Sequence, residues 1–211
     1  MVEFSVVPSK MALINVDMQN RFVENSPVAA PDGLIVLERI NELIVVCREA
    51  GVLIVHAAHI IRADYANLGV LGEFAPSVKE GSLKKNSPGA ELHSRLNIDD
   101  SDIQLDKPRF GAFHGTELEL ILRSRNVDTV IISGIATNVC CDTTAREANA
   151  RDFRVFFMQD GTATFGIDDI PPQTIQHVTC ATLGKLFAQV VSVSEMITKL
   201  QNASNTRQTA V

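Results

Sequence analysis

Short apolar runs that alternate with helical patterns are the sequence feature that most limits the folds open to this chain. The runs occupy residues 11–16, 52–57, 127–133, 154–158 and 188–193, and they are apolar on both faces. Strands of this kind are typical of parallel sheets that helices cover on both sides. Between them, apolar residues recur at helical spacing over residues 34–50, 116–125, 138–152 and 173–186. This alternation predicts a doubly wound, Rossmann-like α/β fold with a mainly parallel sheet.

The length of the chain predicts a single domain. It has 211 residues, of which 45% are hydrophobic and 21% charged, an ordinary globular composition that excludes a disordered or coiled-coil body. We expect the domain to span residues 1–201 and a polar, frayed tail to follow over residues 202–211. Residues 61–102 are rich in Gly and Pro and break the alternation. We interpret them as a long excursion that is a lid, an interface element or an irregular surface loop.

Charge and cysteine content limit the partners and the compartment. The chain has 19 basic and 25 acidic residues, a net charge of −6, and no long basic run, so we expect neither nucleic-acid nor membrane binding. No signal peptide is evident, and no apolar run approaches the ~20 residues of a membrane span. The four cysteines include no CxxC pair. This disfavours a zinc or thioredoxin-type site and favours a reducing, cytoplasmic compartment.

Three polar residues follow predicted strands, where ligands bind in open α/β sheets. Asp17 follows the first run, Lys107 follows the short run 103–105, and Cys140 lies in the first turn of the helix after Gly134. Taken singly, Asp17 also fits a helix cap, Lys107 a solvated turn and Cys140 a packing thiol. Together they are a proton acceptor, a cation that lowers the pKa of a thiol, and a nucleophile.

The start of the predicted helix suggests that Cys140 is ionised. Thr137 or Asn138 is expected to cap this helix, and the free N–H groups and dipole of a helix start favour a thiolate. Cys141 is rotated by about 100° around the helix, so at most one of the two thiols faces the site. We expect Cys141 to pack in the core.

The segments NVDMQNRF, DKPRFGAF and GIATNVCCDTTAREA resemble the three catalytic motifs of the isochorismatase-like cysteine hydrolase superfamily. The resemblance covers most of the chain and implies a three-layer α/β/α sandwich. By position, it implies that Asp17, Lys107 and Cys140 are the catalytic triad. It also implies a cis peptide bond between Ile135 and Ala136, which would turn the amides of Ala136 and Cys140 toward one oxyanion.

Cys140 is similar to the nucleophile of the amide-cleaving members, a residue that true isochorismatases as a rule lack. The nearest branch comprises ureidoacrylate amidohydrolase, N-carbamoylsarcosine amidase and biuret or triuret hydrolases, although Gly111 stands where many members carry Ser. The resemblance thus implies a cofactor-free amidohydrolase that acts on a small N-carbamoyl or ureido compound. Alternatives are a nicotinamidase- or maleamate-type amidase, an isochorismatase-type hydrolase, a thiol-redox protein, or a binding protein on the same fold.

The segment after the second run bears on metal and substrate binding. His56 and His59 flank alanines where the nicotinamidases of the superfamily that the chain resembles place an Asp ligand. We therefore expect no metal site, and this departure argues against nicotinamide as the substrate. We expect Gln19 and Phe22 to line the substrate pocket, and His59 and Arg62 to hold a substrate carboxylate or carbonyl. The resemblance also implies a homo-oligomer, either a dimer or a tetramer.

Overall fold

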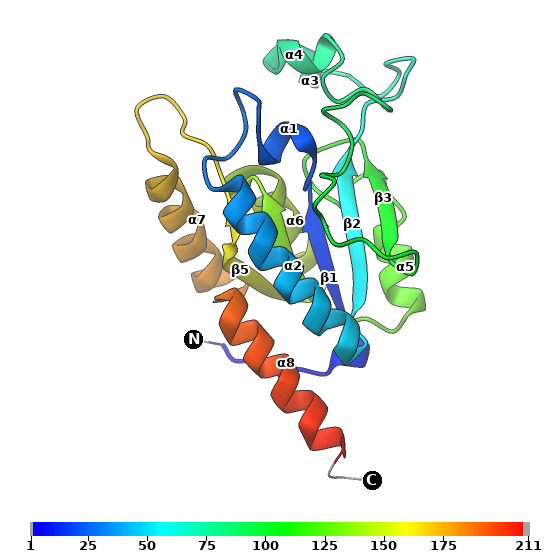
Figure 1. Ribbon diagram of the computed structural model, residues 1–211, viewed down its shortest axis with the longest axis vertical. Helices are drawn as coiled ribbons and strands as arrows, with labels where there is room; N and C mark the ends of the chain where they lie inside the picture. The colour runs from blue at the N-terminus through cyan, green and yellow to red at the C-terminus, as the bar shows by residue number, and fades with distance from the viewer. Residues whose placement is uncertain (1, 209–211) are drawn as a thin grey trace.

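The computed structural model describes residues 2–208, which fold around one six-stranded sheet (Figure 1). The strand order is β3-β2-β1-β4-β5-β6, and every neighbouring pair is parallel. The strands are β1 (Met11–Val16), β2 (Leu53–His59), β3 (Ile103–Lys107), β4 (Thr129–Ile135), β5 (Arg154–Ala163) and β6 (Gln189–Val191). The predicted α/β class with a parallel sheet is confirmed.

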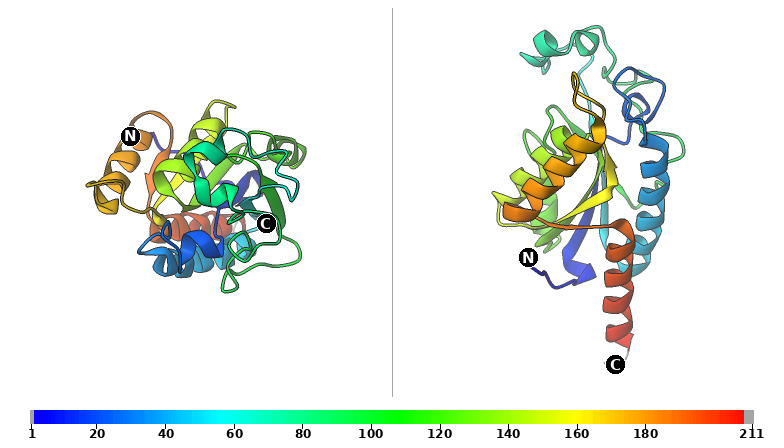
Figure 2. Two further views of the ribbon diagram at one scale, coloured as in Figure 1. Left: turned by 90° about the horizontal axis from the view of Figure 1, so that it is seen from above. Right: turned by 90° about the vertical axis from the view of Figure 1, so that its left-hand side faces the viewer.

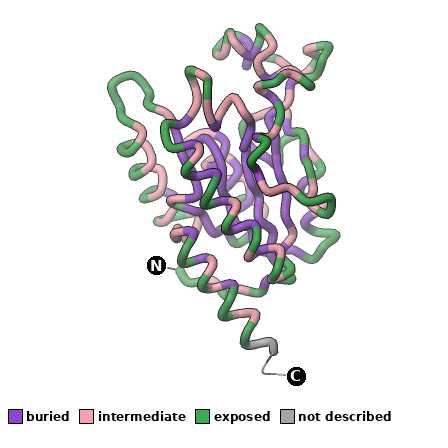
Figure 3. Tube along the Cα trace, viewed as in Figure 1, coloured by how far each residue is buried: buried purple, intermediate pink, exposed green. Residues whose placement is uncertain are grey.

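Helices cover both faces of the sheet and give three layers (Figure 2). On one face lie α2 (Gly33–Ala50) and α8 (Val193–Gln208), and on the other α5 (Leu118–Ser124), α6 (Asp142–Asn149) and α7 (Pro172–Leu186). Leu13 of β1 packs into the core under α2, whereas its neighbours Ala12 and Ile14 pack into the opposite core. Every residue of β1 is buried (Figure 3), which is why the strand shows no polar alternation. Across residues 2–208, no helix combines the length and apolarity of a membrane span.

The strand order reverses between β1 and β4, so these strands diverge into two halves of the fold. The crevice at such a reversal, beyond the carboxyl ends of the strands, is where open α/β sheets bind ligands. Gly134 lets β4 approach β1 closely there: its φ is +124°, and an added Cβ would lie 1.9 Å from the carbonyl oxygen of Val16. Only glycine fits this close approach between β1 and β4.

The C-terminal segment differs from the prediction. We expected a frayed tail from residue 202, but α8 continues without a break through residue 201 to Gln208. Ser192 and Glu195 form a capping box at its start: Glu195 N–H donates to Ser192 Oγ (3.1 Å), and Ser192 N–H donates to Glu195 Oε2 (2.7 Å). The sequence contains this capping box, but the strand that we expected over residues 188–193 included Ser192, so the start of the helix was not predicted. Residues 209–211 lie outside the described part of the chain.

Residues 91–102 of the excursion return along α2 to the start of β3, whereas its earlier part, within residues 61–90, forms a lobe beside the carboxyl ends of the strands (Figure 1). It contains two short helices, α3 (Leu71–Phe74) and α4 (Pro76–Lys79), and packs around its own apolar cluster of Ile61, Leu71, Val78 and Leu83. The short helix α1 (Asn20–Val23) lies between this lobe and β1, and Arg21 N–H donates to the Gly89 carbonyl (3.3 Å). The lobe is therefore joined to the segment that follows the first strand.

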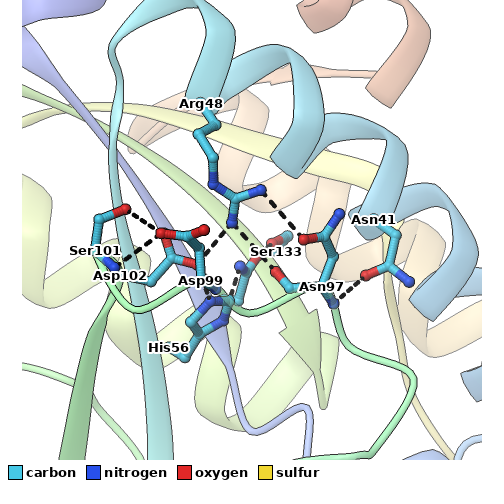
Figure 4. A network of polar contacts seen from close by, with 9 residues as sticks. Asn41, Arg48, His56, Asn97, Asp99, Ser101, Asp102 and Ser133 are labelled. Carbon is cyan, nitrogen blue, oxygen red and sulfur yellow. Dashed lines mark hydrogen bonds and ion pairs between the residues drawn. The ribbon is translucent and has the colours of Figure 1, made fainter.

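A buried polar network crosses the sheet from β4 to the loop before β3 (Figure 4). Ser133 Oγ donates to Asn15 Oδ1 (2.6 Å), and Asn15 Nδ2 contacts His56 Nδ1 (3.3 Å). His56 Nε2 contacts Asp102 Oδ2 (3.2 Å), which also accepts from Arg48 (2.8 Å). Because Nδ1 accepts from an amide and Nε2 faces a carboxylate, the neutral Nε2–H tautomer of His56 satisfies every contact. Burial lowers the pKa of His56 despite the nearby Asp102.

Candidate active site

Asp17 and Lys107 form a fully buried ion pair at the carboxyl ends of β1 and β3. Lys107 Nζ lies 2.9 Å from Asp17 Oδ2 and 3.0 Å from each of the carbonyl oxygens of Arg109 and Phe110. These three acceptors use all three N–H bonds of the ammonium. Lys107 is therefore fixed in place and supplies positive charge rather than a free donor.

Asp17 is held with one oxygen uncommitted. It directly follows β1 with a φ of +53°, in the left-handed region, and its backbone N–H donates to the Ala57 carbonyl (2.8 Å). Oδ2 accepts from Lys107, whereas Oδ1 is buried without a partner that meets hydrogen-bond geometry among the described residues. The Cys140 thiol is close enough that each group shifts the pKa of the other. Oδ1 is thus the oxygen available to this thiol.

Cys140 lies in a π-helical turn, Thr137–Cys141, that joins β4 to α6. The expected side-chain cap is absent from this described turn: Thr137 Oγ1 donates to Gln176 Oε1, and Asn138 Oδ1 accepts from Thr164 Oγ1 (2.6 Å). The peptide bond between Ile135 and Ala136 is cis, at the position that the resemblance implied. The Ala136 N–H interacts with the Cys140 sulfur and acts to lower its pKa.

Burial determines the charge state of the three groups. Burial, and then the negative charge of Asp17, raise the pKa of the Cys140 thiol above its ordinary value, and Lys107 only partly offsets this. Burial also raises the pKa of Asp17, against the opposing effect of Lys107. For Lys107, burial acts to lower the pKa, but the charges of Asp17 and Cys140 raise it overall. Burial and the Asp17 charge thus favour the neutral thiol, which is opposite in direction to the effect that we expected from the helix start.

A cavity of about 210 Å³ opens onto Cys140. Its wall is mainly apolar, and the lobe within residues 61–90 supplies one side of it. The lining consists of Arg21, Phe22, Val28, His59, Leu71, Phe74, Ala75, Val78, Leu83, Phe110, Ala136, Val139, Cys140 and Phe165. Since an apolar cavity of about 150 Å³ holds a benzene molecule, the size suits a small organic amide. A larger cavity of about 610 Å³ shares Arg21 with this one but does not include Cys140.

Two of the four expected substrate-binding residues line this cavity, namely Phe22 and His59. Gln19 does not, because its side chain is buried and committed to backbone groups. It accepts from the His59 N–H (2.8 Å) and donates to the Ala90 carbonyl (2.6 Å). Arg62 is also outside the cavity: it is exposed and pairs with Asp64 at 2.8 Å. The structure therefore does not bring Arg62 to the cavity of Cys140, and the expected contact with a substrate carboxylate stays a prediction.

Arg21 is the cation that the sequence analysis missed. It lies on α1, four residues after Asp17, and lines the cavity. Its Nη2 donates to Ser77 Oγ (2.7 Å), but its buried Nε has no partner, and no ion pair within residues 2–208 involves it. The sequence offered one signal for Arg21 as a cavity residue, namely its position next to Phe22, which we did expect in the pocket.

The two histidines of β2 do not gather into a metal-binding group. His56 belongs to the network that crosses the sheet, and His59 lines the cavity. The described residues contain no group of three or more His, Cys, Asp or Glu side chains placed to hold a metal ion.

Comparison with known sequences places this arrangement in context. Residues 11–195 match the model of the isochorismatase domain. The chain is 31% identical over 187 residues to Nicotinamidase 3 of Arabidopsis thaliana, covering 88% of this chain and 86% of that protein. It is 29% identical over 221 residues to the ureidoacrylate amidohydrolase RutB of Cronobacter turicensis, covering 95% and 92%.

Solved structures show the same fold. A cysteine hydrolase from Pseudomonas syringae pv. phaseolicola superposes with a TM-score of 0.92 at 29% identity, over 96% of this chain and 97% of that one. An isochorismatase family protein from Desulfovibrio vulgaris superposes with a TM-score of 0.80 at 27% identity, over 89% and 96%. The sheet order, the helical layers and the excursion beyond β2 thus belong to a fold that is already known from hydrolases.

Proposed function

This chain belongs to the isochorismatase family of hydrolases, and from that premise we propose that it is a cysteine amidohydrolase. The proposed substrate is a small linear amide of the N-carbamoyl or ureido class, and the proposed product is ammonia or an amine. The single observation that carries the proposal is the Cys140 thiol, which lies at an apolar cavity beside the buried Asp17–Lys107 pair. The 29% identity to a ureidoacrylate amidohydrolase over 95% of the chain supports the substrate class.

In the proposed first step, Asp17 removes the proton from the Cys140 thiol. Because the pKa of the thiol is raised by burial, proton removal has to accompany attack on the substrate carbonyl. Asp17 Oδ1, which has no other partner in the described structure, takes the proton, and Lys107 stabilises the charges that develop. The sulfur forms a bond to the carbonyl carbon, and the C=O electron pair moves onto the oxygen.

The backbone amides of Ala136 and Cys140 are the proposed donors to that oxyanion, a contribution of ~3–4 kcal/mol per donor in other enzymes. The tetrahedral intermediate then collapses, and Asp17 returns the proton to the nitrogen as the C–N bond breaks. Water, deprotonated by the same carboxylate, attacks the resulting thioester. The acid product leaves and Cys140 is regenerated.

A second candidate is an amidase that acts on an aromatic amide. The cavity wall favours it, because Phe22, Phe110 and Phe165 line a space larger than a benzene ring requires. The 31% identity to a nicotinamidase points in the same direction. Either substrate would react through the same three residues.

Ammonia release from a panel of amides tests the function. The panel contains ureidoacrylate, N-carbamoylsarcosine, biuret, triuret, maleamate and nicotinamide, each assayed with the wild type and with Cys140→Ala. We expect at least one ureido compound to release ammonia, and Cys140→Ala to abolish release. Turnover of nicotinamide alone would favour the second candidate, whereas turnover that survives Cys140→Ala would refute a cysteine mechanism.

We further propose that the protein acts in the cytoplasm as a homo-oligomer, either a dimer or a tetramer. All four cysteines are free, which suits a reducing compartment. The cavity residue Phe74 is 84% exposed and Val70 of the same lobe is 59% exposed, so apolar side chains at the edge of the cavity are open to contact with another subunit. Sedimentation of the purified chain measures the assembly, and a purely monomeric protein would contradict it.

A further inference from the structure

His59 lies next to the proposed catalytic residues. It ends β2, where it is paired in register with Lys107 of β3. The residue is 2% exposed and lines the same cavity as Cys140. Its ring packs edge-on against Phe110, with the ring centroids 5.9 Å apart. Packing and backbone pairing thus hold the imidazole in one orientation in the cavity that Cys140 also lines.

The two ring nitrogens of His59 have different surroundings. One interacts with the carbonyl oxygen of Pro108, so this nitrogen carries a proton. Nε2 is buried and has no hydrogen-bond partner in the described structure, so we assign the proton to Nδ1. A buried polar atom without a partner is costly and needs an explanation, and a ligand in the cavity that His59 lines would supply one. Nε2 then carries a lone pair and can only accept.

The surroundings keep the imidazole neutral. Burial, and then the positive charges of Lys107 and Arg109, lower the pKa of His59 to about 3. A neutral ring with its proton on Nδ1 cannot donate from Nε2 to a carboxylate or a carbonyl. The role that we expected for His59 from the sequence therefore does not fit this geometry.

The rest of the cavity makes this acceptor distinctive. The side chains of its described lining are hydrocarbon apart from the Cys140 thiol, the Arg21 guanidinium, which only donates, and the His59 ring. We propose that His59 Nε2 accepts a hydrogen bond from an N–H on the nitrogen bonded to the scissile carbonyl. His59 thereby selects amides over esters of the same shape. This inference rests on the proposed amidohydrolase function and adds a specificity residue to it.

Two alkylating agents test the contact without turnover, because both react with the Cys140 sulfur. Iodoacetamide carries an NH₂ group, whereas methyl iodoacetate carries a methoxy group in its place and has no N–H. Each second-order rate is measured at Cys140 by mass spectrometry and divided by the rate with glutathione, which corrects for intrinsic reactivity. We expect the wild type to prefer iodoacetamide by about three- to tenfold, the fold-change that a neutral hydrogen bond supplies.

Variants at position 59 assign that preference. His59→Phe keeps a ring but removes the acceptor. The ratio of the iodoacetamide rate to the methyl iodoacetate rate at Cys140 should then fall to the ratio that glutathione shows for the same two reagents, while the methyl iodoacetate rate itself changes little. His59→Gln supplies a carbonyl oxygen and should restore part of the preference. An equal fall in both rates would indicate a merely structural role and overturn the proposal. A wild type without any preference would overturn it too, whether or not the variants fold.

This experiment also separates the two proposals. If the wild type prefers iodoacetamide but hydrolyses no amide of the panel, the amidohydrolase function fails and the N–H contact stands. If it hydrolyses an amide but shows no preference, the function stands and the role of His59 fails.

Discussion

Lys107 Nζ lies 2.9 Å from Asp17 Oδ2, and both side chains are completely buried. Two backbone carbonyls take the remaining N–H bonds of the ammonium, so the pair is locked and its other carboxylate oxygen, Oδ1, is left for the Cys140 thiol. Such a pair is costly to desolvate and is not by itself evidence of stabilisation. A catalytic role beside the Cys140 thiol explains the buried pair better, because Asp17 provides a base and Lys107 balances the negative charge that develops.

Asp17→Asn should separate the acidity of the thiol from catalysis. The Asp17 charge raises the pKa of Cys140, so its removal should lower that pKa and extend thiolate formation to lower pH. The kcat should nevertheless fall by about 10²- to 10⁴-fold, because the general base is lost. The pH dependence of iodoacetamide labelling gives the pKa, and ammonia release gives kcat.

Lys107→Met is the opposing control for this experiment. Lys107 lowers the pKa of Cys140, so its loss should raise that pKa and slow labelling at every pH below it. The variant leaves the Asp17 carboxylate buried without its partner, at a cost of about 3–5 kcal/mol of stability, so folding is checked by circular dichroism. If both variants moved the thiol pKa in the same direction, the assigned electrostatics would be incorrect.

Cys141→Ala should retain activity, whereas Cys140→Ala should abolish it. The Cys141 side chain is fully buried in the core, and its Sγ faces the Ser133 carbonyl at 3.9 Å. Its truncation should cost about 1 kcal/mol of stability. Turnover and urea unfolding measure the two effects. An inactive Cys141→Ala together with an active Cys140→Ala would move the nucleophile to residue 141.

Arg21→Met should discriminate between charged and neutral substrates. Arg21 lines the cavity with an unpartnered Nε, so a substrate carboxylate is its natural counter-ion. We expect kcat/KM for maleamate to fall by about ten- to hundredfold and that for uncharged biuret to change little.

Arg62→Met is the matched control for Arg21, because Arg62 is exposed and paired with Asp64. It should leave the kinetics of both substrates unchanged. A selective loss on maleamate in Arg62→Met but not in Arg21→Met would support the expectation drawn from the sequence.

His56→Gln should reduce the acid sensitivity of the fold. Burial lowers the pKa of His56, so the folded state disfavours its protonated form. The stability contributed by the neutral ring is fully present above the unfolded-state pKa of about 6.5 and is lost as the pH falls toward the lower pKa of the folded state. Urea unfolding at pH 7.5, 6.5 and 5.5 should therefore show a smaller decline for the variant than for the wild type. His59 contributes in the same direction, so some decline remains.

His177→Gln provides the reference for that measurement, since His177 is exposed on α7. It should retain the wild-type decline of stability with acid. If His56→Gln and His177→Gln behaved alike, the network around His56 would not be a source of the acid sensitivity.

The sequence by itself determined the sheet and the residue types at its edge. Apolar runs predicted β1 at residues 11–16, as observed. They predicted that β5 ends at residue 158, whereas the strand continues to Ala163 past an irregularity in its pairing with β4. The prediction stopped early because Gln159 and Asp160 interrupt the apolar pattern. Asp17, Lys107 and Cys140 were identifiable because parallel strands bring their carboxyl ends to one edge.

Only the tertiary structure decided which side chains reach the cavity and what charge they carry. The Gln19 side chain does not reach the cavity because it hydrogen-bonds to backbone groups of His59 and Ala90, which are remote in sequence. The Arg62 side chain pairs with Asp64 instead. Burial in the folded chain raises the pKa of Cys140, whereas the helix start that its local sequence suggests would lower it. Desolvation and the supply of hydrogen-bond partners are properties of the assembled fold, so no local pattern specifies them.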